Sequence, residues 1–197
     1  MKKRRVIIGI DEVGRGALAG PLFVAALVMP QGLKLRKKSL PRLKDSKKLN
    51  PRQREEWAEY LEGHPKISYA LASVSPGIVD KKNVTRAANI AATRALKRLT
   101  TNMKKKASVY LDGGLYVNKE QGIGSYKTKT LIRGDEKINA VKLASIIAKV
   151  KRDNYMVRLH DKYPAYGFRE HKGYGTKKHK KALKKHGISP VHRLTFI

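Results

Sequence analysis

The most informative segment of the chain is Gly9-Ile10-Asp11-Glu12-Val13-Gly14-Arg15-Gly16. Residues 5–10 form a short apolar run rich in β-branched side chains, which predicts a buried strand. Two adjacent carboxylates end the run, and a Gly-Arg-Gly turn follows whose backbone can closely approach a ligand. Acids at the tip of a buried strand are costly unless a cation lies beside them. The segment therefore predicts a divalent metal bound where nucleic acid also binds.

The composition indicates a polyanionic partner. The chain has 197 residues, enough for one domain, and 41% of them are hydrophobic, enough for a real core. Its 45 Lys and Arg against 15 Asp and Glu give a net charge of +30. A merely soluble surface is usually acidic or mixed in sign, so a nucleic-acid partner is the better interpretation. The absence of cysteine excludes disulfides and thiolate metal sites and fits a reducing compartment.

The N-terminus resembles the start of a signal peptide, since residues 1–5 read Met-Lys-Lys-Arg-Arg. The apolar run that follows is broken at Asp11, and the chain has no apolar stretch of about 18 residues. We therefore expect a cytoplasmic protein with no membrane partner.

The hydrophobic pattern predicts a mixed sheet flanked by helices. We expect strands over residues 5–10, 21–29, 67–74, 107–111 and 126–132. We expect helices over residues 51–61, 76–99 and 138–160, and a basic helix over residues 177–185. A basic loop over residues 32–48 and a glycine-rich excursion with glycines at 113, 114, 122 and 124 connect them.

Four acids stand at the ends of these elements. Asp11 and Glu12 end the first strand, Asp112 ends the fourth, and Asp135 precedes the long helix. If the first and fourth strands are parallel neighbours, their carboxyl ends meet, which is where open α/β sheets bind ligands. Each acid alone has a simpler explanation as a turn or a helix cap. Together, without cysteine or histidine nearby, they predict a site for Mg²⁺ or Mn²⁺.

Asp153 competes with Asp135 for the place of fourth acid. It follows Asp135 by 18 residues, which in one continuous helix is roughly 27 Å. Both cannot reach one metal pair unless the helix begins well after Asp135. We rank Asp135 first and expect Asp153 to pair with a neighbouring base.

These residues resemble ribonuclease HII, the prokaryotic type 2 ribonuclease H. The similar motifs occur in the family's order over nearly the whole chain. They comprise residues 9–16 (GIDEVGRG), 45–49 (DSKKL), 111–113 (LDG), 134–135 (GD), 144–150 (ASIIAKV) with Arg152-Asp153, and 173–176 (GYGT) with His179. Residues 114–130 match nothing we can place, and their role is left open.

The resemblance implies a ribonuclease H-like fold of class α/β, a central five-stranded mixed sheet flanked by helices with a small helical C-terminal part. It implies endonucleolytic hydrolysis of the RNA strand of RNA–DNA hybrids. It also implies incision 5′ of ribonucleotides embedded in duplex DNA, by a two-metal mechanism that leaves 3′-hydroxyl and 5′-phosphate ends. Asp11, Glu12, Asp112 and Asp135 would then be the metal-binding catalytic acids, with Mg²⁺ or Mn²⁺ as cofactor.

The resemblance also assigns substrate contacts. Gly14, Arg15 and Gly16 would contact the backbone and the 2′-hydroxyl at the RNA–DNA junction, and glycines permit the close approach that this requires. Tyr174 would stack on the sugar just past the junction, although ordinary core packing would also explain a tyrosine there. Lys47 is either a phosphate contact or part of a solvated charge run. His179 is either a phosphate contact or an incidental surface histidine.

We divide the chain into a catalytic part, residues 1–160, and a basic C-terminal segment, residues 161–197, packed on it and contributing to substrate binding. A monomer is expected. The main rival is a non-catalytic basic RNA-binding or ribosome-associated protein, which explains the charge but not the four acids. A second rival, ribonuclease HIII, typically carries an additional N-terminal substrate-binding domain, which we do not expect here because the first predicted strand begins by residue 5.

Overall fold

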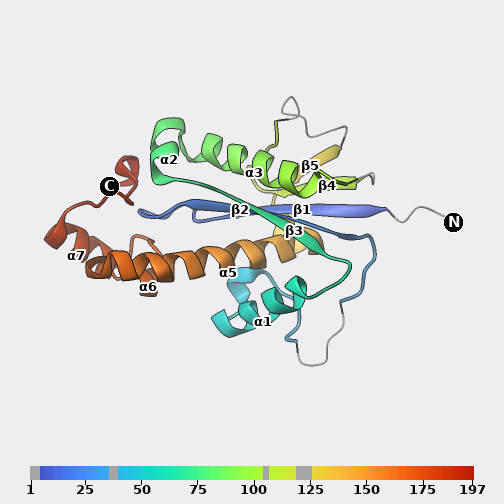
Figure 1. Ribbon diagram of the computed structural model, residues 1–197, viewed down its shortest axis with the longest axis horizontal. Coiled ribbons are helices and arrows are strands. Elements are labelled where there is room, and N and C mark those ends of the chain that lie inside the picture. Colours follow the sequence, from blue (N-terminus) through green and yellow to red (C-terminus); the bar gives the residue numbers. More distant parts are fainter. Residues whose placement is uncertain (1–4, 36–39, 104–106, 119–125) are drawn as a thin grey trace.

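A five-stranded mixed sheet organises the chain (Figure 1). The computed structural model describes residues 5–35, 40–103, 107–118 and 126–197. The strands are β1 (Val6–Val13), β2 (Leu22–Pro30), β3 (Ser68–Val74), β4 (Ala107–Asp112) and β5 (Lys127–Leu131). Their order is β3-β2-β1-β4-β5, with β3, β2 and β1 antiparallel and β1, β4 and β5 parallel. The predicted α/β class and the mixed sheet are confirmed.

Helices cover both faces of this sheet (Figure 1). One layer holds α2 (Pro76–Lys82) and α3 (Val84–Thr100), and the other holds α1 (Pro51–Glu62) and α5 (Asn139–Lys162). The second half of the chain also contains three shorter helices, α4 (Gly134–Lys137), α6 (Phe168–His171) and α7 (Lys177–His186). Helix α7 lies at the end of the molecule that also carries the C-terminus.

Strand periodicity divides the core into two layers. In β2, Val24 and Ala26 face α3, whereas Ala25 and Leu27 face α5. The alanine-rich buried side of α3 lets this helix lie close to the sheet. On the other face, α5 comes closer still at Gly9, where an added Cβ would lie 2.1 Å from the carbonyl carbon of Ala140. The glycine of the first motif therefore brings α5 against the strand that bears the acids.

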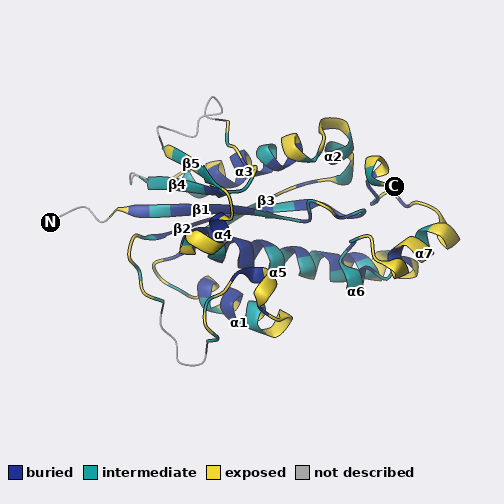
Figure 2. Cartoon of the chain, turned by 180° about the vertical axis from the view of Figure 1, so that it is seen from behind, coloured by how far each residue is buried: buried dark blue, intermediate teal, exposed yellow. Residues whose placement is uncertain are grey.

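A third cluster joins the C-terminal segment to the rest of the chain. Ala19, from the turn after β1, packs with Met156, Leu159, Tyr166 and Phe168. Helix α5 runs to Lys162, so the predicted division at residue 160 falls within its last turn. The exposed face of α7 is visible in Figure 2.

Two predicted elements differ from the structure. Strand β1 extends to Val13, beyond the predicted end at Ile10, because β2 pairs with it along that whole length. Its pairing with β4 does stop at Ile10, so the prediction captured the parallel half of the ladder. The single helix predicted over residues 76–99 is wrong, since Asn83 adopts φ 61° and separates α2 from α3. Apolar spacing does not register this break, because the side chains on either side still face the core.

Within the described ranges, no helix is long and apolar enough to cross a membrane. The predicted glycine-rich excursion lies partly outside the described residues, since Gly122 and Gly124 belong to residues 119–125.

Candidate active site

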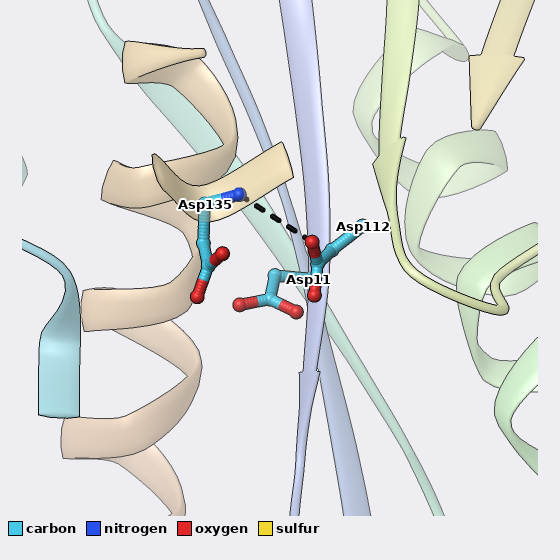
Figure 3. Close-up of side chains that lie close together, drawn as sticks. All are labelled: Asp11, Asp112 and Asp135. Atoms are coloured by element: carbon cyan, nitrogen blue, oxygen red, sulfur yellow. Dashed lines mark hydrogen bonds between the residues drawn. The ribbon is translucent and has the colours of Figure 1, made fainter. Parts of the chain in front are cut away.

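Three aspartates from three different elements converge at one end of the sheet (Figure 3). Asp11 lies in β1, Asp112 ends β4, and Asp135 lies in the one-turn helix α4. One carboxylate oxygen of each lies within 4.8 Å of the others. Asp11 and Asp135 are both 4% exposed. The parallel pairing of β1 with β4 brings the first two together, as the sequence predicts.

Glu12 does not belong to this three-residue group. Successive side chains of a strand point to opposite faces, so Asp11 shares the α5 side with Gly9 while Glu12 points to the α3 side. There, Glu12 Oε1 accepts a hydrogen bond from Arg15 at 3.1 Å. Arg15 in turn donates to the hydroxyl of Thr85 in α3 at 2.8 Å. The predicted convergence is thus direct for three of the four acids, and Glu12 flanks them.

Backbone donors hold Asp112 in place. Its Oδ1 accepts hydrogen bonds from the amides of Gly134 at 2.6 Å and Asp135 at 3.4 Å, the second drawn in Figure 3. Arg133, immediately before, has the left-handed conformation with φ 55°. The turn between β5 and α4 therefore fixes Asp112 and presents Asp135 beside it.

Burial and neighbouring negative charges raise the pKa values of Asp11, Glu12 and Asp135. Burial raises the pKa of Asp11 well above its ordinary value, and the charges of Glu12 and Asp112 raise it further. Burial raises the pKa of Glu12 against the opposing effect of Arg15. The pKa of Asp135 is raised by burial and then by Asp112. Carboxylates kept this close without a cation destabilise their ionised forms.

The cluster opens into a cleft of about 310 Å³. All of the residues that line it belong to the motifs quoted from the sequence. They are Asp11, Glu12, Val13, Gly14, Arg15, Gly16, Ser46, Lys47, Asp112, Ser145, Lys149 and Tyr174. The cleft therefore combines Asp11, Glu12 and Asp112 with groups suited to a nucleic-acid backbone, and Asp135 lies beside Asp112 at its edge.

The site fits a hard divalent cation. All candidate ligands are carboxylate oxygens, which Mg²⁺ and Mn²⁺ prefer. Within the described part of the chain, Glu12 Oε2 is one of few buried side-chain polar atoms without a hydrogen-bond partner. A buried carboxylate oxygen left unpaired beside other carboxylates is costly, and a cation would satisfy it.

The Gly-Arg-Gly turn lies beside Tyr174. Ala17 forms a β-bridge with Tyr174, and Gly173 O accepts hydrogen bonds from the amides of Leu18 and Ala19 at 2.9 and 3.2 Å. The Tyr174 ring lies 5.4 Å from the guanidinium carbon of Arg152. Residues that are far apart in sequence thus form one wall of the cleft.

The two glycines of this turn are needed for different reasons. Gly14 has φ 89°, and a Cβ there would lie 2.2 Å from Nε of Arg152. A Cβ on Gly16 would meet no described atom within 4 Å. Internal packing therefore accounts for Gly14, whereas at Gly16 the missing side chain leaves open surface at the cleft.

Lys47 lies at the rim, with its side chain 80% exposed and its ammonium 3.7 Å from Asp135 Oδ2. Partial burial lowers its pKa, but the charges of Asp135, Asp45 and Asp11 outweigh this effect and the pKa is raised. The ammonium is therefore charged and free to turn toward solvent. Its backbone is held by Asp45, which accepts from the Lys47 amide at 3.1 Å.

The predicted phosphate contact of His179 is wrong, as is the alternative of a surface histidine. Its side chain is 0% exposed, and its Nδ1 lies 3.0 Å from the carbonyl oxygen of Tyr174. Amphipathic spacing could have revealed this, because His179, Ala182 and Leu183 repeat at helical intervals along the inner side of α7. The many lysines of the helix obscured the pattern.

The motif of residues 144–150 contains two cleft residues on α5 to which the sequence assigned no role. Ser145 hydrogen-bonds Ser46 at 2.8 Å between the two hydroxyls and also contacts Asp11. Lys149, one turn further along, pairs with Asp153 at 2.9 Å. The expected pairing of Asp153 with a neighbouring base is thereby confirmed. The i, i+4 spacing of Ser145, Lys149 and Asp153 places them on one helix face and was available as a signal.

The fold and the carboxylate cluster together define a nuclease of the ribonuclease H-like class. The sequence model of the family described as Ribonuclease HII matches residues 8–197. The chain belongs to the ribonuclease HII family. The general activity of the protein follows from this membership, namely metal-dependent endonucleolytic cleavage of RNA in RNA–DNA hybrids. The enzyme interpretation is therefore confirmed over the non-catalytic binder.

Individual relatives agree with the family assignment. The chain is 42% identical over 190 residues to the Ribonuclease HII of Endomicrobium trichonymphae, covering 96% of this chain and 84% of the relative. Its fold is similar to that of RNase HII from Archaeoglobus fulgidus, solved in complex with PCNA, with a TM-score of 0.73, 27% identity, and coverage of 98% and 95%. Ribonuclease H2 from Pyrococcus horikoshii OT3 gives a TM-score of 0.70 at 27% identity, with coverage of 96% and 93%.

Proposed function

We propose that the protein incises duplex DNA on the 5′ side of an embedded ribonucleotide, in addition to cutting the RNA strand of continuous hybrids. The observation that carries this proposal is the adjacency of the three-aspartate cluster to the wall formed by Gly14, Gly16 and Tyr174. A site that reads a single 2′-hydroxyl needs close backbone approach next to the reacting phosphate. The cleft offers both within one surface.

The reaction is hydrolysis of one phosphodiester bond. A water oxygen forms a bond to phosphorus, the bond from phosphorus to the 3′ oxygen breaks, and that oxygen takes up a proton. The products are a 3′-hydroxyl on the upstream nucleotide and a 5′-phosphate on the ribonucleotide. Two bound Mg²⁺ or Mn²⁺ ions would supply activation of water and stabilisation of the leaving oxygen.

The acids of the chain would hold these ions and orient them. Asp11, Asp112 and Asp135 are the first candidates because their oxygens already converge. Glu12 is the fourth, on the strength of its unpaired buried oxygen at the same cleft. The hydrogen bonds of Gly134 and Asp135 to Asp112 keep that carboxylate from rotating, which favours a fixed ligand geometry.

The wall of the cleft would recognise the junction. The open surface at Gly16 permits the sugar to approach the backbone, and Arg15, held between Glu12 and Thr85, offers its remaining donors to a phosphate. The ring of Tyr174 would stack on the sugar beyond the junction. Lys47, exposed at the rim, would contact a phosphate near Asp135.

The C-terminal segment would add affinity without sequence preference. Helix α7 carries six lysines, all exposed, and the segment packs on the catalytic part through the cluster around Phe168. Contacts of this kind position a duplex and weaken with salt. The two-part division of the chain, a monomeric state and a cytoplasmic location stay predictions from the sequence.

The test is incision of an end-labelled DNA duplex that contains one ribonucleotide, with Mg²⁺ or Mn²⁺ and with excess EDTA. We expect one cut, 5′ of the ribonucleotide, only with metal, and an upstream product that a DNA polymerase can extend from its 3′-hydroxyl. An all-DNA duplex of the same sequence serves as control. Cleavage of a continuous hybrid without incision at the single ribonucleotide would contradict the proposal.

The two glycines give a matched pair of variants. Gly16→Ala should keep the thermal stability of the wild type and lose incision, because the added methyl meets the substrate and nothing else. Gly14→Ala should lose stability, because Arg152 and the positive φ oppose it. Full incision by Gly16→Ala would argue against backbone approach at this residue.

A further inference from the structure

Three histidines, of which two are buried and one is half-buried, surround the loop that carries Tyr174. His171 lies at the end of α6, His179 lies in α7, and His192 lies in the turn that follows. The rings of His171 and His179 stack with centroids 4.5 Å apart and an interplanar angle of 13°. His179 and His192 are 0% and 3% exposed.

The hydrogen bonds of His179 determine which of its nitrogens carries the proton. Its Nδ1 lies 3.0 Å from the carbonyl oxygen of Tyr174, which has no proton to give, so Nδ1 must donate. Its Nε2 lies 3.0 Å from Nε2 of His192. In a neutral His179 ring, Nε2 is then an acceptor, and His192 must be the donor.

The same reasoning extends to His192 and Ser189. If His192 donates through Nε2, its Nδ1 accepts, and it receives the Ser189 amide at 3.0 Å and the Ser189 hydroxyl at 2.8 Å. The same Nδ1 also lies 3.3 Å from the Ser189 carbonyl oxygen. A hydrogen bond there would need a charged ring, either His192 itself or His179 together with the opposite tautomer of His192, and burial lowers the pKa of His192. Burial disfavours that charge and lowers the pKa of His179 to about 4.

His171 holds the other side of the same loop. Its Nε2 lies 2.8 Å from the carbonyl oxygen of Tyr166 and must donate, and its Nδ1 accepts the Gly173 amide at 3.2 Å. The Gly173 amide and the Tyr174 carbonyl are therefore both bound by histidines. This arrangement fixes the main chain of residues 173–174 while the Tyr174 ring projects into the cleft.

We propose that His179 is a positioning residue for Tyr174, oriented by an ordered chain of hydrogen bonds that runs from Ser189 through His192. The inference rests on the proposed stacking role of Tyr174 and explains why a buried histidine stands in a segment of lysines. His179 touches no substrate in this arrangement. It acts by holding the carbonyl of the residue that does.

The first measurement is the tautomer of each ring. Imidazole ¹⁵N spectra of the full-length protein at neutral pH should show His179 protonated at Nδ1 and His192 protonated at Nε2, both neutral. A His179 ring protonated at Nε2 alone would overturn the proposal, because the carbonyl of Tyr174 would then lack its donor. A positively charged His179 would also overturn it, because its Nε2 would then donate to His192 and reverse the chain of hydrogen bonds.

A matched pair of substitutions separates the two links of His179. In His179→Asn, the side-chain amide falls near the position of Nδ1 and can still donate to Tyr174. In His179→Gln, the amide falls near Nε2 and reaches toward His192 instead. Each variant removes one buried hydrogen bond, so thermal unfolding should place them at similar stability. With ¹³C-labelled tyrosine, the Tyr174 ring signals should move in His179→Gln and stay close to wild type in His179→Asn.

Kinetics then connect position to function. On a duplex with one ribonucleotide, His179→Gln should lose about tenfold or more in kcat/KM, mainly in kcat, because small misplacement of a positioning group is costly. His179→Asn should stay within about threefold of wild type. The double variant His179→Gln with Tyr174→Ala should be no slower than Tyr174→Ala alone, since one residue acts through the other. His64→Asn, just after α1 and in ring contact with Tyr60, is the matched histidine control.

The outcomes separate this proposal from the proposed function. If Tyr174→Ala costs no more on the single ribonucleotide than on a long hybrid, junction stacking is wrong, and the ring signals alone decide the role of His179. If Tyr174→Ala is selective but the two His179 variants behave alike, or their losses add to that of Tyr174→Ala, the positioning role is overturned. Unchanged Tyr174 ring signals in His179→Gln would overturn it as well.

Discussion

Buried acids and buried arginines lie a short way apart in this molecule, and they differ in whether the fold supplies them with partners. Asp11 and Asp135 are 4% exposed, and Arg152 and Arg193 are 0% exposed. Among the described residues, none of the ion pairs involves either arginine. Their donors go instead to five backbone carbonyls, those of Arg15, Ala19, Gly20, Pro21 and Lys172.

The buried arginines have a structural role, whereas the buried acids have a functional one. The arginines are satisfied within the fold and hold the turn between β1 and β2 against the C-terminal segment. The acids repel one another, and Glu12 Oε2 beside them has no partner among the described residues. A buried charge that is fully hydrogen-bonded needs nothing further, whereas the acidic cluster is complete only with a cation.

The largest effect should come from the acidic side. Asp112→Asn should reduce kcat on a hybrid by more than about 100-fold, because even the partners of metal ligands are worth 10- to 100-fold. Hybrid affinity should persist, since the basic surface supplies it, and thermal stability should not fall. Single-turnover cleavage measures the chemical step, filter binding measures hybrid affinity, and thermal melts measure stability. Asp161→Asn is the control, since Asp161 is an exposed acid paired with Arg169. Activity within threefold of wild type would remove Asp112 from the site.

The arginine side should respond in stability. Arg152→Met leaves three carbonyls without their donor and should cost about 3 kcal/mol, since each orphaned group costs about 1 kcal/mol or more. The melting temperature should fall by roughly 10 °C. Arg158→Met, at an exposed position of the same helix, should change it little. A variant as stable as wild type would show that removing the buried charge offsets the lost hydrogen bonds, and would contradict a stabilising role of Arg152.

The raised pKa of Asp11 gives a pH test of the same contrast. As pH rises, the unfolded state loses this proton before the folded state does, so the contribution of Asp11 to stability is present in acid and is lost through the raised pKa. In EDTA, Asp11→Asn should therefore be more stable than wild type at pH 8, with the difference shrinking toward pH 4. Thermal melts over this range measure it. Added Mg²⁺ should stabilise the wild type at pH 8 and not the variant.

The smallest effect should come from Asp153, a carboxylate satisfied like the arginines. It pairs with Lys149 at 2.9 Å, and both side chains are mostly buried. Asp153→Asn should cost about 1 kcal/mol and less than tenfold in kcat, whereas Asp135→Asn should cost more than about 100-fold. Parallel kinetics on one hybrid compare them. A greater loss in Asp153→Asn, with the fold intact, would mean that the wrong acid was ranked first.

Local patterns in the sequence predicted most of the helices and strands. The apolar run of residues 21–29 predicted β2 within one residue at each end, and the alanine spacing of residues 84–99 predicted the buried side of α3. The break at Asn83 was missed, because a residue in an unusual backbone conformation leaves the periodicity around it intact. The basic helix was expected over residues 177–185 and found as α7, Lys177–His186.

By itself, the sequence determined the type of chemistry and its main residues. Acids placed where strands and helices begin or end, in a chain of net charge +30, implied oxygen-ligated cations beside a polyanion. Such inferences depend on chemical identity and on neighbours along the chain, which the sequence states directly.

Only the tertiary structure determined which of those residues are buried and what each of them contacts. Strand periodicity sent Asp11 and Glu12 to opposite faces, and packing buried His179 behind Tyr174 instead of exposing it to phosphate. Arg152 and Arg193 read in the sequence like any other base of this chain, yet they are interior residues that hold a turn. Burial and partners depend on segments more than 100 residues apart, such as Pro21 and Arg152, and no local pattern encodes such a contact.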